Sequence, residues 1–75
     1  MEVFQLNYAV TLGKTCNFSR AAEKLFITQP TLSYQIQRLE NEVGFPLFLR
    51  TSKSVSVTVE GRKFLKEAEK VLKEY

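Results

Sequence analysis

Apolar side chains dominate residues 3–12, which read VFQLNYAVTL. A helix that is apolar on so many sides is typical of a deeply buried position. We therefore predict a first helix over this stretch, ending near Gly13. Its buried residues are expected to include Phe4, Leu6, Ala9 and Val10.

A second apolar pattern follows after a short polar stretch. It has the i, i+3, i+4, i+7 spacing of one helix face and consists of Phe18, Ala21, Ala22 and Leu25. Ser19 is a suitable N-cap for this helix, and the paired alanines would let another helix approach closely. Phe26 and Ile27 are then expected to form a tight corner.

A third helix is predicted directly after this corner. Thr28 is a candidate N-cap, and Pro30 suits the first turn, where its missing N–H costs nothing. Gly44 ends the helix, with Pro46 just beyond. The apolar face consists of Leu32, Ile36, Leu39 and Val43.

The pattern changes to a period of two near Val55 and Val57, which alternate with serine and threonine. Residues 47–58 therefore predict a small β-hairpin with a polar tip. Thr58 would cap a fourth helix that runs to Tyr75. The expected fold class is mainly α: a winged helix-turn-helix of three helices and a hairpin wing, followed by a linker helix.

Composition narrows the choice of function. The chain has 75 residues, one cysteine, no histidine and a formal charge of +3. An internal disulfide and a Cys–His nucleophile are thereby excluded, and one cysteine without histidine argues against the usual zinc site. We expect no metal, no cofactor and no enzymatic activity. Cys16 is expected to be a small packing residue. The basic balance permits an anionic partner but is weak evidence alone.

The same data bear on location and association. A single unpaired cysteine fits a reducing cytoplasm, no apolar run reaches the ~20 residues of a membrane span, and the acidic start MEVFQLNYAV does not resemble a signal peptide. A chain this short buries little core, so association with another chain is the expected source of additional stability.

The free face of the third helix carries the candidate DNA chemistry. In helix-turn-helix proteins the helix after the tight turn enters the DNA major groove. Glutamine can bond an adenine edge, and serine can bond either base type. No acidic residue occurs between Glu23 and Glu40. The residues of this face are Gln29, Pro30, Ser33, Tyr34, Gln37 and Arg38.

Several residues keep an alternative interpretation. The polar face could be an ordinary solvated surface, and the chain a helical protein-interaction module without DNA affinity. Arg50 and Lys53 could contact phosphate or the minor groove, or lie on a solvated hairpin. Arg20 and Lys24 are either phosphate contacts or ordinary surface cations. Tyr34 could pack on a neighbouring helix instead of contacting DNA.

The fourth helix has more apolar residues than one narrow stripe requires. They are Phe64, Leu65, Ala68, Val71, Leu72 and Tyr75. These residues either form a wide core face or partly face a second chain, and we favour dimerisation. Four glutamates lie among five basic residues from Glu60 to Glu74, which argues against a membrane-surface helix.

The stretch NFSRAAEKLFITQPTLSYQIQRLENEVGFPLFLRT, residues 17–51, resembles the DNA-binding domain of bacterial LysR-type transcriptional regulators. The matching positions are Phe18, Ser19, Ala21, Ala22, Leu25, Thr28, Gln29, Pro30, Ser33, Ile36, Leu39, Glu40, Gly44, Leu47, Phe48 and Arg50, followed by Thr58 and Gly61. The resemblance implies that the helix over about residues 29–43 docks in the major groove. It also implies dimers that pair through the fourth helix, bind inverted-repeat operators and often assemble into tetramers.

Together, the residues and the resemblance give the candidate DNA contacts Ser19, Arg20, Thr28, Gln29, Pro30, Thr31, Ser33, Tyr34, Arg38, Arg50 and Lys53. Residues 1–57 would form the DNA-binding unit and residues 58–75 a shortened linker helix. The effector-binding domain of the family, and with it the small-molecule site, is expected to be absent from this chain.

Three positions depart from the family pattern. Tyr34 stands where many members carry arginine or lysine, so the free face of the third helix has one positive charge fewer. The wing reads TSKSVSVT and lacks the usual glycines. Cys16 stands where many members have glycine, so the end of the first helix is expected to differ, with Gly13 as the residue that shapes it.

Overall fold

The computed structural model describes residues 1–52 and 54–74. Its elements are α1 (Val3–Thr15), α2 (Phe18–Leu25), α3 (Gln29–Val43), β1 (Phe48–Arg50), β2 (Val55–Val57) and α4 (Val59–Lys73). The predicted order of elements is therefore confirmed, including the antiparallel hairpin. Lys53 and Tyr75 lie outside the described residues.

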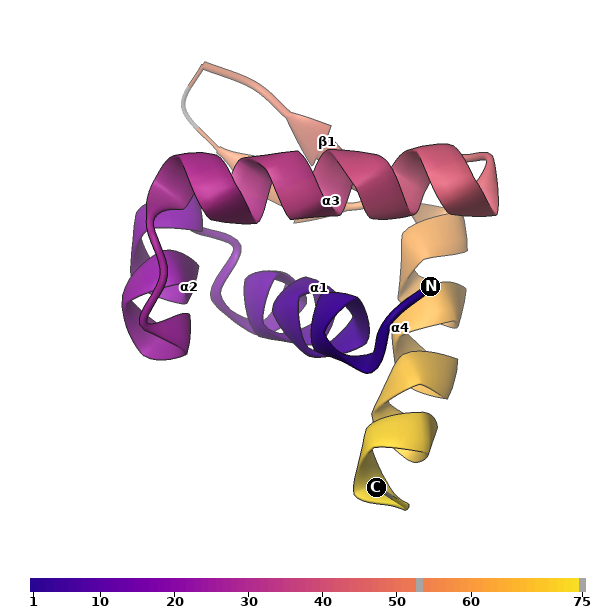
Figure 1. The fold of residues 1–75 in the computed structure, drawn as a ribbon. Coiled ribbons are helices and arrows are strands. Elements are labelled where there is room, and N and C mark those ends of the chain that lie inside the picture. Colours follow the sequence, from indigo (N-terminus) through magenta and orange to yellow (C-terminus); the bar gives the residue numbers. More distant parts are fainter. Residues whose placement is uncertain (53, 75) are drawn as a thin grey trace.

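Helix α1 is the centre of the packing, because it contacts α2, α3 and α4. Figure 1 shows α3 crossing above α1, with α2 near the N-terminal end of α3 and α4 near its C-terminal end. The hairpin emerges on the upper side of α3, above its N-terminal half. One broad side of α3 is therefore left free of other helices.

Burial along α1 agrees only in part with the sequence pattern. Leu6, Ala9 and Val10 are buried as predicted, but Phe4 is 44% exposed and its ring meets the edge of the Tyr8 ring at 5.3 Å. The prediction for Phe4 was wrong because apolar residues surround α1, and the packing of α2, α3 and α4 against it leaves Phe4 largely exposed. Leu12, by contrast, is fully buried.

The end of α1 lies further along the chain than predicted. The helix continues through Gly13 to Thr15, and Cys16 takes the left-handed conformation at φ 51°. The Cys16 N–H donates to the Leu12 carbonyl at 2.7 Å, so this residue closes the helix in the way that glycine usually does. Cys16 is exposed, and its predicted packing role was wrong.

The N-cap of helix α2 is Asn17, not Ser19. The Asn17 side chain accepts a hydrogen bond from the Arg20 N–H at 2.9 Å, and the chain is already helical at Phe18. Ser19 therefore lies within the first turn, where its hydroxyl is free to bond elsewhere. The predicted inner face is confirmed, because Ala21 and Ala22 are buried in the core.

The turn between α2 and α3 is built on a second left-handed residue. Phe26 has φ 58° and its side chain is 95% exposed, while its N–H bonds back to the end of α2. Thr28 then caps α3 as predicted, by accepting from the Thr31 N–H. Leu32, Ile36 and Leu39 are fully buried on the inner face of α3, Val43 is half-buried, and Gly44 ends the helix at φ 87°.

The base of the wing is bonded to both flanking helices. Glu40 Oε2 accepts from the Leu47 N–H at 2.7 Å and from the Phe48 N–H at 3.1 Å. Thr58, the N-cap of α4, donates its hydroxyl to the Pro46 carbonyl and accepts from the Gly61 N–H, both at 2.8 Å. The start of β1 and the start of α4 thus form one hydrogen-bonded junction.

Gly61 is required at this junction because two backbones approach closely. A Cβ added to Gly61 would overlap the carbonyl oxygen of Leu47. Gly13 of α1 is a milder case, because an added Cβ would lie 2.7 Å from the tip of the Leu65 side chain of α4. Both contacts fix where α4 lies against the rest of the domain.

Most of the apolar face of α4 is used within the chain. Leu65 and Ala68 are buried in the chain's own core, and Phe64 and Leu72 pack partly against it. This corrects the expectation for Leu65 and Ala68, because little of either side chain remains for a partner. Val71 is 46% exposed. Within residues 1–52 and 54–74, no helix has the length and apolarity to cross a membrane.

Candidate nucleic-acid interface

The outward face of α3 contains most of the side chains that the sequence predicted as DNA contacts. Gln29, Pro30, Tyr34 and Arg38 are exposed, and Ser33 is half-buried. They lie on the side opposite the buried stripe that begins at Leu32, so α3 presents a continuous polar surface. Gln37, on the same face, is also exposed.

The first turn of α3 is ordered by its own threonines. The Thr28 hydroxyl accepts from the Thr31 N–H at 3.2 Å and donates to Thr31 Oγ1 at 2.8 Å. Both threonines are exposed. Because the N-terminal N–H groups of a helix attract anions, this turn is suited to a phosphate contact.

Arg50 connects the wing to both helices of the helix-turn-helix. Its Nη1 donates to Ser33 Oγ at 3.0 Å, and its guanidinium carbon lies 4.4 Å from the centre of the Phe18 ring. The planar guanidinium combines a hydrogen bond with stacking, which lysine does not reproduce. Arg50 therefore holds β1, α2 and α3 together while its side chain stays at the exposed surface.

Ser19 and Gln29 meet across the turn. The Ser19 hydroxyl donates to Gln29 Oε1 at 3.0 Å, although the two residues are ten positions apart. They line a polar hollow of about 320 Å³ where the start of α2, the start of α3 and the wing converge. Its lining residues are Cys16, Asn17, Phe18, Ser19, Gln29, Thr51, Ser52, Ser54 and Val55.

Tyr34 lies on the open surface. Its side chain is 58% exposed, and the Arg38 guanidinium carbon lies 5.8 Å from the centre of its ring, on the same helix. The alternative that Tyr34 packs on a neighbouring helix is therefore wrong. A cation remains near position 34, because Arg38 is one turn away on the same face.

Charge along α3 favours an anionic partner at its N-terminal part. Arg20, Lys24, Arg38 and Arg50 are all exposed, and acidic residues on α3 begin only at Glu40. Farther along, Glu42 accepts a bond of 2.6 Å from the amino group of Met1. This bond raises the pKa of the Met1 amino group above its usual value, and it places a positive charge beside Glu42.

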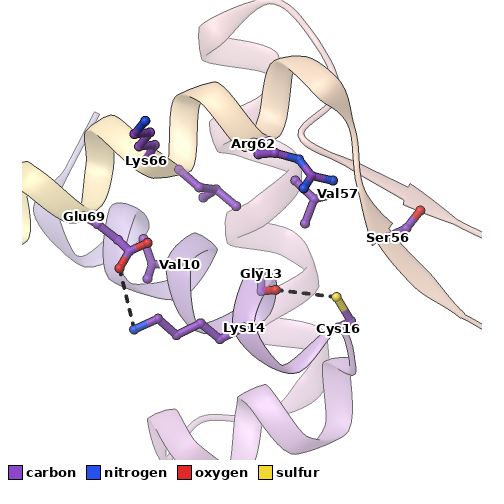
Figure 2. Close-up of a pocket in the computed structure, with 10 residues that line it drawn as sticks. Val10, Gly13, Lys14, Cys16, Ser56, Val57, Arg62, Lys66 and Glu69 are labelled. Carbon is purple, nitrogen blue, oxygen red and sulfur yellow. Dashed lines mark hydrogen bonds and ion pairs between the residues drawn. The ribbon is translucent and has the colours of Figure 1, made fainter.

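A second, larger cavity of about 610 Å³ is lined mainly by residues of α1, β2 and α4 and by none of α3; Figure 2 shows these side chains. Its floor is apolar and includes Val10 and Leu65, and an ion pair of 3.8 Å between Lys14 and Glu69 lies at its edge. Arg62 and Lys66 of α4 also line it, so basic side chains outnumber the single acidic one around an apolar floor. Among the described residues, no cluster of three or more metal-ligating side chains occurs.

Two interactions at the interface were missed from the sequence. The sequence pattern gave Glu40 only as the end of a stretch without acidic residues and as a position of the family pattern, but its carboxylate accepts from the first N–H groups of the wing. Phe18 was assigned to the core, but it also stacks on Arg50. Spacing along one helix does not indicate either contact, because each joins different elements.

These features define a winged helix-turn-helix domain. Similarity to known proteins shows the family to which this domain belongs. The chain belongs to the lysR family of bacterial regulatory helix-turn-helix proteins, whose sequence profile matches residues 3–62. Relatives in this family are transcriptional regulators, so the expectation that the chain is not an enzyme is confirmed.

Two curated relatives illustrate the likeness. The chain is 46% identical over 74 residues to the Hca operon transcriptional activator HcaR of Escherichia coli (strain K12), covering 99% of this chain and 25% of HcaR. It is 47% identical over 72 residues to the regulator BudR of Klebsiella aerogenes, covering 96% of this chain and 50% of BudR. The chain thus spans between a quarter and half of these relatives.

Solved structures agree with the sequence relatives. The DNA-binding domain of BenM in complex with catB site 1 DNA matches with a TM-score of 0.94 and 44% identity, covering 99% of this chain and 80% of that one. The CbnR DNA-binding domain in its DNA complex matches with a TM-score of 0.94 and 33% identity, covering 97% and 84%.

Proposed function

We propose that this chain is the sequence-specific DNA-binding domain of a LysR-type transcriptional regulator, with α3 in the major groove. The observation that carries the proposal is the close likeness to BenM and CbnR domains solved with DNA. The exposed polar face of α3, with the wing beside its N-terminal half, supports the same docking.

Roles divide between base reading and backbone contact. Gln29, Ser33 and Tyr34 lie where side chains of a recognition helix reach base edges. Phosphate contacts are proposed for the exposed polar and basic residues nearby, which are Thr28, Thr31, Arg20 and Arg38. Pro30 offers an apolar surface beside the first turn. Arg50, and Lys53 outside the described residues, are proposed as wing contacts.

Replacing Gln29 with alanine tests the base-reading role. We expect Gln29→Ala to weaken binding to the preferred site by about 1–3 kcal/mol and to relax the preference at one base pair. The measurement is fluorescence anisotropy on the site selected from a random DNA pool and on its single-base variants. Equal losses on selected and random DNA would remove Gln29 from base reading.

Salt dependence separates DNA binding from the alternative of a protein-interaction module. Each phosphate that the domain neutralises adds about −0.9 to the slope of log affinity against log salt. A steep negative slope on the selected duplex is expected. Absence of DNA binding at low salt, with the domain folded, would contradict the proposal.

We further propose that the domain dimerises through α4 and binds an inverted repeat. Support comes from Val71, which is exposed, and from Phe64 and Leu72, which are only partly covered. A helix of 15 residues is about 22 Å long, and half-sites of dimeric helix-turn-helix proteins lie about 34 Å apart or a multiple of this. In a longer protein such dimers would assemble into tetramers.

Val71→Glu tests this dimer. Val71 is suited to the test because it is exposed in the single chain, whereas Leu72 packs partly against the core. We expect wild type to sediment as a concentration-dependent dimer and the variant as a folded monomer, whose melting temperature no longer rises with protein concentration. The variant should bind half-sites but lose tight binding to the full repeat. A wild type that stays monomeric at high concentration and binds single half-sites only would contradict the dimer.

The remaining assignments follow from the family. Residues 1–57 are proposed as the DNA-binding unit and residues 58–75 as the linker helix. Binding of a small-molecule effector is proposed for a further domain of the kind that LysR-type regulators carry. The proposed site of action is the bacterial cytoplasm, where the chromosome is accessible.

A further inference from the structure

The side chain proposed to read a base is not free in this domain. Gln29 is the first residue of α3, is exposed, and carries a long side chain with several rotatable bonds. Ordering such a side chain at an interface lowers affinity by about twofold to tenfold. The Ser19 hydroxyl, 3.0 Å from Gln29 Oε1, restricts it before any partner arrives.

The contact also has a direction. A hydroxyl that donates to Oε1 turns the carbonyl end of the amide toward α2, so the NH₂ group points the other way. An amide oxygen keeps a second lone pair, and the NH₂ group keeps both of its hydrogens. Gln29 is therefore presented as a donor, with a reduced capacity to accept.

The scaffold around this pair is fixed independently of it. Asn17 caps α2 through the Arg20 N–H, and Thr28 caps α3 through the Thr31 N–H. Arg50 holds the two helices to the wing through Phe18 and Ser33. The Ser19 hydroxyl is not needed for any of these contacts, so its bond to Gln29 acts on the Gln29 side chain alone.

We propose that Ser19 is a specificity-determining residue, which orients the Gln29 amide so that its NH₂ group faces the DNA bases. This inference rests on the proposed function. The contacted base should be a purine whose N7 accepts a hydrogen bond from the NH₂ group of Gln29. The sequence predicted Ser19 as a direct DNA contact. In this proposal Ser19 instead affects DNA recognition by positioning the Gln29 side chain.

The test compares five proteins on one panel of duplexes. The proteins are wild type, Ser19→Ala, Ser19→Thr, Gln29→Ala and the double variant Ser19→Ala/Gln29→Ala. The duplexes carry each of the four base pairs at the position where Gln29→Ala relaxes the preference, and at one control position. Affinities are measured at fixed salt, and melting temperatures confirm folding.

Wild type is expected to discriminate roughly tenfold or more at the Gln29 position. Ser19→Ala should reduce that discrimination by about threefold to tenfold, since the amide can then rotate and must be ordered on binding. Discrimination at the control position should not change. Ser19→Thr keeps the hydroxyl and should keep the preference, and Ser19→Ala should add nothing in the Gln29→Ala background.

Other outcomes overturn the inference. If Ser19→Ala weakens all duplexes equally and adds to the effect of Gln29→Ala, Ser19 is a backbone contact. If replacing the preferred purine by its 7-deaza analogue, which lacks the N7 acceptor, leaves wild-type affinity unchanged, the NH₂ group of Gln29 does not face that acceptor. Failure of wild type to bind any duplex would instead overturn the proposed function, and this inference with it.

Discussion

Replacing Glu40 with alanine is expected to lower the free energy of unfolding by about 3 kcal/mol, because two charge-assisted hydrogen bonds are lost at once. One carboxylate oxygen of Glu40 accepts from the N–H groups of Leu47 and Phe48. Both N–H groups lie in a partly buried junction, where a donor without a partner carries a desolvation cost. Chemical denaturation measures the loss.

The wing should respond more strongly than the helices to this change. Hydrogen exchange is expected to accelerate at Leu47 and Phe48 before it does in α1, and DNA affinity should fall because the hairpin is no longer held beside α3. Glu40→Gln is the matched control, since its amide oxygen can still accept and its shape is unchanged. If Glu40→Ala is as stable as Glu40→Gln, the two bonds contribute little.

Adding one methyl group at Gly61 is expected to cost about 3 kcal/mol, at the upper end of overpacking effects. The new Cβ would overlap the Leu47 carbonyl oxygen, which is backbone and belongs to the same junction. Either α4 or the start of β1 has to move, and the Gly61 N–H bond to Thr58 is then strained. The melting temperature should fall by roughly 12–24 °C, since a domain of this size loses about 4–8 °C per kcal/mol.

Gly13→Ala is the control for this experiment. There the added Cβ meets the tip of the Leu65 side chain, which can change rotamer, and alanine favours the helix by about 1 kcal/mol over glycine. We expect its stability to stay within about 1 kcal/mol of wild type. Equal destabilisation by the two variants would show that helix packing in general, and not the Leu47 backbone, is the constraint.

Local sequence patterns predicted the elements well because each element has a strong local signal. The threonine caps at Thr28 and Thr58 and the glycine after α3 mark helix ends through bonds between near neighbours. The start of α2 was misplaced because Asn17 and Ser19 are both good caps, and only the backbone conformation of Asn17 decides between them. The end of α1 was misplaced because Cys16 adopts a conformation more typical of glycine.

The candidate site was predictable as a face but not as a set of contacts. Helical spacing identifies which side of α3 is free, and the observed exposure of Gln29 and Tyr34 agrees with it. Spacing does not reveal that Arg50 stacks on Phe18 or that Ser19 bonds Gln29, because those pairs depend on how three elements pack. For the same reason, helical spacing did not reveal that Leu65 and Ala68 of α4 are buried in the chain's own core.

The junction of Thr58, Gly61 and Leu47 has a mechanical consequence. Helix α4 is fixed there through hydrogen bonds and close backbone contact, and again where Leu65 meets Gly13. The helix is about 22 Å long, and its N-terminal part is held at the base of the wing while its C-terminal end extends away from it. Because α4 is held at both places, we expect a displacement of its far end to rotate the domain, α3 included, instead of bending the chain at the junction.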